Sequence, residues 1–292
     1  AALVASALLV HRRRGMTRAE LLRVCRHLLG ALELFGAQVA SAVRLDDGTI
    51  REDTLDGALG LFLDARLITQ HETGAEAIYT IPEERRIALE YYKNNILHFF
   101  VPTAMIALAM GAAGGAAIRL AELEERVRTL SRLFKYEFMY RADAGFEVIF
   151  ADALRAMQEA GWLRHDEGCR GDHCEAAPGE LGELLGTFAD MLRTYVESYL
   201  LATRAIGPLL ERPQGRKEWI RRTLTLGQRM YLAGEIEQRE SLSKPKLETA
   251  LEALRDMKLL RLEGRERVLA GERLDEGEGA RALERELRRL LR

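Results

Sequence analysis

Apolar residues recur at helical spacing along most of the chain, with charged residues between them. Residues 17–36, TRAELLRVCRHLLGALELFG, begin with Thr17 and Glu20, a pair whose side chains cap the free N–H groups of a first helical turn. Apolar side chains then follow every three or four positions, which is the period of an amphipathic helix. The pattern therefore predicts helices as the main secondary structure.

A helical stretch followed directly by a short apolar run occurs three times. The three strings, ALGLFLDARLITQ, ALRAMQEAGWLRH and ALEALRDMKLLRL, begin at Ala58, Ala153 and Ala253. After the first and third, a turn leads to a second apolar run, at residues 77–81 and 268–269. We therefore predict a mainly α fold with short winged-helix-like β-hairpins, arranged as three structurally related subunits.

This pattern divides the chain into three predicted regions. Residues 1–90 are expected to form a helical, winged-helix-like N-terminal unit. Residues 91–207 would form a helical core, and residues 208–292 a winged-helix-like C-terminal unit followed by a tail helix.

The longest uncharged stretch is ILHFFVPTAMIALAMGAAGGAAI, residues 96–118. As a helix it is long enough to cross a hydrocarbon core of roughly 30 Å. His98, Pro102 and several glycines and alanines make it less apolar than its length suggests. Three structures therefore stay open: a membrane span, a buried core helix and a helix lying in the membrane interface.

Aromatic and polar residues precede the apolar segment and suit either a lipid headgroup region or a protein contact. Several of them share a helix face, because they lie within about one and a half turns. A buried, hydrogen-bonded role for the histidine is the alternative to a docking role. The predicted docking residues are Tyr91, Tyr92, Lys93, Asn94, Asn95 and His98.

The overall charge is close to balanced, with 43 Lys and Arg against 45 Asp and Glu in 292 residues. A net charge of −2 supplies no global field for a polyanion, which disfavours a nucleic-acid partner. In the third helix-and-hairpin subunit, acidic residues also alternate with the basic ones. Local basic clusters at residues 11–14 and 212–222 nevertheless suit a surface of anionic lipid.

The segment HDEGCRGDHC places two histidines and two cysteines within ten residues of a glycine-containing, acidic stretch. His165, Cys169, His173 and Cys174 would complete a tetrahedral zinc set. Against zinc, the adjacent His173 and Cys174 are awkward for chelation, and the spacing fits no common zinc finger. The alternative is a solvent-exposed loop between helices, and we predict no other cofactor.

Several strings resemble one protein family. They are RIALEYYKNNILHFFVPTAMI at residues 86–106, LFKYEFMYRADAGF at 133–146, LRTYVESYLLATRAI at 192–206 and LVASALL near the start. These strings are similar to the carboxy-terminal region of the membrane-bound glycerol-3-phosphate 1-O-acyltransferases, a region shared with the dihydroxyacetone-phosphate acyltransferases. The resemblance covers most of the chain and is looser after Gly207.

The resemblance implies acyl transfer from acyl-CoA or acyl carrier protein to glycerol-3-phosphate, in phospholipid synthesis. Family members use an H-x4-D motif, in which the histidine is the general base and the aspartate orients it. None of the six histidines here has an aspartate five positions later, and no FPEG-type motif occurs. The resemblance therefore assigns no catalytic residue to this chain, which we predict to be inactive alone.

The sequence thus predicts a non-catalytic accessory portion of an acyltransferase at the cytoplasmic face of the inner membrane. Its expected partners are its own N-terminal acyltransferase domain and an anionic membrane surface, with acyl-CoA or acyl carrier protein acting through the parent enzyme. The alternative is a soluble winged-helix protein with an interaction or regulatory role.

Overall fold

The computed structural model describes residues 1–10, 15–45, 49–73, 76–114, 117–139, 144–166, 172–264, 266–273 and 278–291. Within these ranges helices dominate, and the strands form only small antiparallel sheets. The prediction of a mainly α fold is therefore confirmed.

Along the described parts of the chain, four single helices alternate with three units that share one order of elements, β-α-α-β-β. The single helices are α1 (Ala2–Val10), α4 (Arg86–Gly111), α7 (Glu180–Arg204) and α10 (Glu278–Leu290). The first unit comprises β1 (Met16–Thr17), α2 (Arg18–Leu34), α3 (Glu52–Asp64), β2 (Thr69–Thr73) and β3 (Glu76–Thr80). The second comprises β4 (Ile118–Arg119), α5 (Leu120–Leu133), α6 (Phe146–Glu159), β5 (Leu163–Asp166) and β6 (His173–Ala176). The third comprises β7 (Gln214–Gly215), α8 (Arg216–Leu232), α9 (Lys244–Asp256), β8 (Leu260–Glu263) and β9 (Arg267–Ala270), and the short 3-10 helices are η1 (Glu83–Arg85), η2 (Gly207–Leu210) and η3 (Arg239–Ser241).

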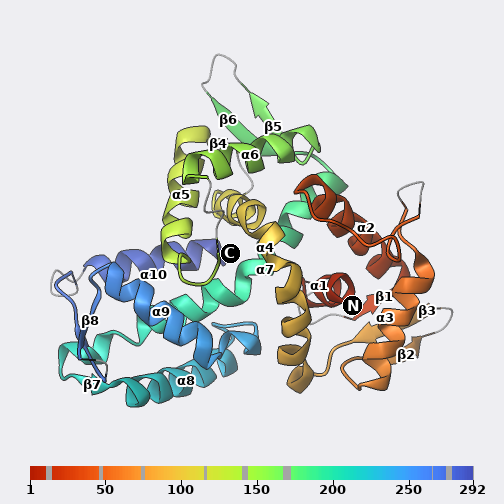
Figure 1. Ribbon diagram of the computed structural model, residues 1–292. Coiled ribbons are helices and arrows are strands. Elements are labelled where there is room, and N and C mark those ends of the chain that lie inside the picture. The colour runs from red at the N-terminus through yellow and green to blue at the C-terminus, as the bar shows by residue number, and fades with distance from the viewer. Residues whose placement is uncertain are drawn as a thin grey trace.

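The three units surround the central pair α4 and α7, which gives the molecule three lobes (Figure 1). In every unit the two-residue first strand pairs with the last strand, so that the sheet orders are β1-β3-β2, β4-β6-β5 and β7-β9-β8. The three predicted subunits are therefore present as a repeated topology. Their interpretation as winged helices stays a prediction.

The units also share the way in which their second helix ends. The second residue after α3, α6 and α9 has a left-handed backbone, at Arg66 (φ 52°), Gly161 (φ 73°) and Lys258 (φ 60°). The next N–H then bonds back to a carbonyl near the helix end, as Trp162 does to Met157 at 2.9 Å. This turn directs the chain out of the helix and into the hairpin.

The capping box predicted at the start of the first unit is confirmed. The Thr17 side chain accepts from the Glu20 N–H, and the Glu20 carboxylate accepts from the Thr17 N–H at 2.9 Å. These bonds satisfy N–H groups that the first turn of α2 leaves free.

The second unit has a hairpin where the sequence offered a loop or a zinc site. Strands β5 and β6 pair antiparallel, with His165 opposite Cys174. Cys169 and the rest of residues 167–171 lie outside the described residues. The alternative of a loop between helices is therefore wrong for the flanking residues, which form the strands.

The predicted apolar segment 96–118 divides between two elements, since α4 ends at Gly111 and β4 begins at Ile118. All side chains from residue 103 to 110 are buried, mainly against α7, α1, α5 and α6. Among the described residues, Glu83–Gly111 is long and apolar enough to span a membrane. Length and composition do not separate such a span from the core helix of a soluble protein, which meets the same criteria. The burial of α4 within the protein favours the core-helix alternative.

The predicted regional boundaries can be placed on these elements. The boundary after residue 90 lies within α4, and that after residue 207 lies in η2. The three-region division itself stays a prediction, and the repeated topology offers a different partition into lobes and central helices.

Candidate functional site

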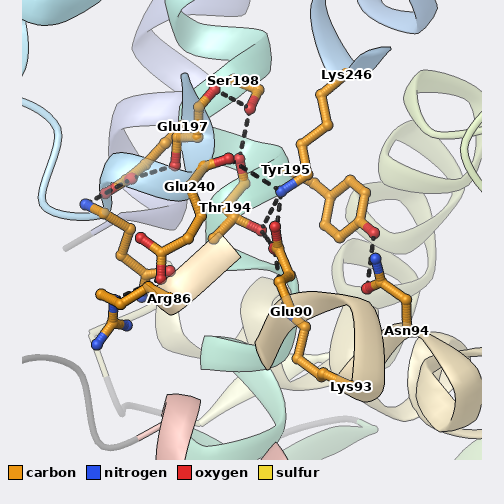
Figure 2. Close-up of polar contacts among 12 residues, drawn as sticks. Arg86, Glu90, Lys93, Asn94, Thr194, Tyr195, Glu197, Ser198, Glu240 and Lys246 are labelled. Atoms are coloured by element: carbon orange, nitrogen blue, oxygen red, sulfur yellow. Dashed lines mark hydrogen bonds and ion pairs between the residues drawn. The ribbon is translucent and has the colours of Figure 1, made fainter. Parts of the chain in front are cut away.

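A buried layer of charged and hydroxyl side chains joins the central helices to the third unit (Figure 2). Helix α4 contributes Arg86, Glu90 and Lys93, and η3 and α9 contribute Glu240 and Lys246. All five are at most 7% exposed. Because isolated buried charges are costly, their partners determine what the layer can do. From α7, the layer includes Thr194, Tyr195, Glu197 and Ser198.

Glu90 is at the centre of this layer. Its Oε1 atom accepts hydrogen bonds from Lys246 Nζ at 2.8 Å, from Thr194 Oγ1 at 2.9 Å and from Lys93 Nζ at 3.3 Å. Burial alone would raise the pKa of Glu90, but the charges of Lys246 and Lys93 outweigh it and hold this pKa at about 2. Glu90 is therefore a permanent anion at neutral pH.

The two lysines that bind Glu90 have different surroundings. Lys93 also donates to the Met191 carbonyl at 3.3 Å, and burial lowers the pKa of Lys93, with Glu90 offsetting part of this effect. The Lys246 ammonium lies 4.6 Å from the centre of the Tyr195 ring. Both cations are thus held by an anion and by polar or aromatic groups, away from solvent.

Two further contacts attach η3 to the central helices. Arg86 Nε donates to Glu240 Oε1 at 2.5 Å. The Glu197 carboxylate accepts from the Ser241 hydroxyl at 2.6 Å and from the N–H groups of Glu237 and Gln238 at 2.9 and 3.1 Å. These contacts fix the loop that leads from α8 into α9.

Glu197 and Glu137 both have pKa values above the ordinary range. Burial raises the pKa of Glu197, although its hydrogen bonds act in the opposite direction. Burial also raises the pKa of Glu137, which follows α5, to about 7, although Lys246 and two hydroxyl groups favour the charged form. Glu137 is therefore a carboxyl group whose protonation would change near neutral pH.

The arrangement is suited to fixing helices rather than to catalysis. Glu90 does not take up a proton at neutral pH with a pKa of about 2, and its Oε1 atom already accepts from three donors. Lys93 and Lys246 are almost fully buried, so that a substrate has no access to their amines. We therefore interpret the layer as a structural joint between α4, α7 and α9.

The predicted docking residues lie on different sides of α4. Tyr91 is 71% exposed, and Asn94, Asn95 and His98 are also exposed, at positions i, i+3, i+4 and i+7. Ile87, one turn before Tyr91, is 58% exposed on the same face. We call these five residues the α4 face, and a docking role for it stays a prediction.

The inclusion of Lys93 in this docking surface was wrong, because its side chain is 3% exposed and points into the polar layer. Tyr92 is half-buried, with its ring centre 5.1 Å from that of Phe62 in α3. The docking prediction grouped Lys93 with Asn94 because the two are adjacent in the sequence. Adjacent residues of a helix point about 100° apart, so the two side chains lie on different faces. A sequence signal was present, since Glu90 and Lys93 are an i, i+3 pair of opposite charge.

The proposed zinc ligands lie mainly in the hairpin of the second unit. Cys174 is fully buried, while His173 precedes it and points to the opposite face of the strand. His165 contacts Asp172 through its Nε2 atom. Among the described residues no group of three potential ligands converges, and Cys169 lies outside them, so zinc binding stays an untested prediction.

The polar layer includes residues that the sequence analysis did not single out. Glu90 and Lys246 are 156 positions apart, and Glu197 and Ser241 are 44 apart. The available signal was a charge within an apolar run, as Glu197 has in the string TYVESYLL. Such a charge is rarely buried without a partner, but spacing does not identify that partner.

The fold is mainly helical, and the buried polar layer joins its central helices to the third unit. Comparison with known families identifies the family of the chain: residues 1–263 match the family described as the glycerol-3-phosphate acyltransferase C-terminal region. The chain belongs to this family, which confirms the resemblance found in its sequence.

Curated relatives include proteins named "Putative acyltransferase plsB1" from Mycobacterium bovis and from two strains of Mycobacterium tuberculosis. Each is 24% identical to this chain over 145 residues. The aligned part covers 48% of this chain and 23% of each relative, so the chain corresponds to a limited part of these proteins.

Proposed function

We propose that this chain is the non-catalytic C-terminal portion of a glycerol-3-phosphate acyltransferase, where it braces the catalytic domain and aids membrane association. The parent enzyme would transfer an acyl group from acyl-CoA or acyl carrier protein to glycerol-3-phosphate. The observation that carries the proposal is the match of residues 1–263 to the C-terminal region of that family. The absence of an H-x4-D sequence from all 292 residues supports it.

The structure supports a bracing role through the polar layer and the α4 face. The layer fixes α4 against α7 and α9 with buried hydrogen bonds, which gives α4 one defined position. On its exposed side, α4 presents Ile87 and Tyr91 to solvent. Large apolar or aromatic side chains that are exposed next to each other are typical of surfaces that bind a partner. An aromatic side chain of this kind is typical of the centre of a protein interface.

A first experiment separates the accessory role from a catalytic one. The purified 292-residue chain is incubated with glycerol-3-phosphate and acyl-CoA, alone and as part of a longer enzyme that contains an H-x4-D domain. We expect turnover only in the longer enzyme. Turnover by the isolated chain would contradict the proposal.

A second experiment tests the α4 face in the longer enzyme. Tyr91→Ser combined with His98→Ala should lower activity or membrane recovery about tenfold, if this face contacts the catalytic domain or the membrane. Leu210→Ser in η2 is the matched control, since Leu210 is 56% exposed on another lobe. Unchanged activity and unchanged membrane recovery in the double variant would remove the α4 face from the proposal.

A further inference from the structure

A cavity of about 410 Å³ lies at the start of the third unit, between residues of the end of α7, of η2 and of α8. Its volume is within the range of small-molecule sites. Part of its lining is apolar and comes from Ala205, Pro208, Trp219 and Leu226. Four guanidinium groups also line it, those of Arg204, Arg221, Arg222 and Arg229.

The charge of this cavity is only partly compensated. Arg222 lies 3.8 Å from Glu218, whereas no carboxylate of a described residue lies within 4.0 Å of Arg221 or Arg229. Both of these arginines are exposed to solvent. Within the described part of the chain, the guanidinium groups of Arg221 and Arg229 are therefore uncompensated cations with N–H donors available, and their planar geometry matches phosphate oxygens.

Arg204 is held in place by two carboxylates that are not part of the cavity lining. Its Nε donates to Glu284 at 2.8 Å, and its Nη1 donates to Glu235 at 2.5 Å. Arg288 binds the same two carboxylates, at 3.0 and 3.4 Å, which neutralises them further. A guanidinium fixed in this way is preorganised for an anion, because little side-chain entropy remains to be lost.

A second, independent observation points to a ligand in the cavity. Gln214 lines it, is only 4% exposed, and its Oε1 atom has no hydrogen-bond partner among the described residues. A buried amide oxygen without a donor is costly. The hydroxyl groups of Thr223 and Thr225 are not available to it, since they donate to the carbonyls of Trp219 and Arg221.

We propose that this cavity binds a phosphate ester, with its anionic oxygens on Arg221, Arg229 and Arg204 and a hydroxyl of the ligand donating to Gln214. The apolar lining then contacts the carbon atoms next to the ester. A lipid headgroup and a free phosphate monoester share this chemistry. The proposal does not depend on the bracing role, because it rests on the cavity alone.

The test is a titration of the 292-residue chain with inorganic phosphate, and with vesicles of phosphatidylglycerol or phosphatidylcholine. We expect saturable binding of phosphate, of phosphatidylglycerol vesicles, or of both, and weaker binding of phosphatidylcholine vesicles. Binding of phosphate alone identifies a soluble ligand, and binding of phosphatidylglycerol alone identifies a headgroup. Absence of binding in both arms overturns the proposal.

Matched variants separate a site from general charge attraction. Arg221→Gln with Arg229→Gln should weaken binding about tenfold or more, the effect expected from losing charge-assisted hydrogen bonds. Arg212→Gln with Lys217→Gln removes the same charge from exposed residues near the same helix that do not line the cavity, and should change binding less than about twofold. Equal weakening by both pairs would show a diffuse basic surface and overturn the proposal. All four substituted residues are exposed, so both variants should fold.

Discussion

At the scale of single residues, two carboxyl groups near Lys246 have opposite shifts in pKa. Lysine charges hold the pKa of Glu90 at about 2, whereas burial raises that of Glu137 to about 7. Glu90 therefore contributes stability above its unfolded pKa of about 4.5, and this contribution is lost as the pH falls towards 2. Glu137 has the reverse effect, because its folded form retains a proton that the unfolded chain releases.

The first prediction concerns Glu137. Between about pH 4.5 and 7 the folded protein binds one more proton there than the unfolded chain, so the free energy of unfolding should fall as the pH rises. Over this window Glu137→Gln should remove roughly 2–3 kcal/mol of pH dependence. Urea unfolding at several pH values measures it, with Glu125→Gln on the exposed side of α5 as the control. A variant with the same pH slope as the wild type would contradict the assignment.

The second prediction concerns Lys246. Lys246→Met removes a buried cation and leaves Glu90 with Lys93 as its remaining cation, so the free energy of unfolding should fall by about 3–5 kcal/mol. Glu90→Gln together with Lys246→Met removes both charges and should recover part of the loss. Chemical denaturation of the wild type, both single variants and the double variant measures the coupling energy. Additive losses would show that the two residues do not act as a pair.

At the scale of elements, the three units use one helix ending with different residues. Gly161 adopts its left-handed φ without a side chain, whereas Arg66 and Lys258 have a Cβ in the same conformation. The turn requires a left-handed backbone at this position and does not require one particular residue. Glycine adopts that conformation at the lowest cost, but arginine and lysine occupy it in the other two units.

The third prediction follows from this ending. Gly161→Ala should lower the free energy of unfolding by about 1 kcal/mol, because alanine is strained at a φ of 73°. Gly57→Ala is the matched control: it lies inside α3, is exposed, and a Cβ there meets nothing within 4 Å. That substitution should instead stabilise by about 0.5–1 kcal/mol. Thermal unfolding of both variants checks the opposite signs, and the same sign in both would contradict the argument.

Sequence pattern was sufficient for the second helix and the strand after it in each unit. The strings from Ala58, Ala153 and Ala253 overlap α3, α6 and α9, and each continues into a strand. The strands β1, β4 and β7 could not be predicted, because two residues are too few to show an alternating pattern. Each of these two-residue strands is defined by its hydrogen bonds to the free edge of the last strand of its unit, β3, β6 or β9.

At the scale of the whole molecule, the candidate site could not be predicted because its residues are brought together from distant parts of the chain. Glu90 meets Thr194 across 104 positions, and Arg86 meets Glu240 across 154. Periodicity indicates which face of a helix is buried, and gives no information on the helix it meets. The same holds for the arginine cavity, which combines α8 with Arg204 at the end of α7.

The fourth prediction concerns the distribution of stability over the molecule. Backbone amides in the buried parts of α4 and α7 should exchange with solvent last, since these helices carry the shared core. Amides of strand β2, whose residues 69–72 are exposed, should exchange much earlier. Hydrogen exchange followed by mass spectrometry or NMR measures the order. Equal protection in β2 and in α4 would contradict it.

The distance between Glu90 and Lys246 has a consequence for the protein while it is being made. Glu90 and Lys246 are 156 positions apart, and at a synthesis rate of about 5–20 residues per second this distance takes on the order of ten seconds or more. The first unit is complete on the ribosome well before then, whereas α4 has neither α7 nor Lys246 to pack against. Nascent chains arrested before residue 180 should therefore contain a folded first unit and an α4 whose α7-facing side is uncovered, and that side is the surface that a chaperone would bind.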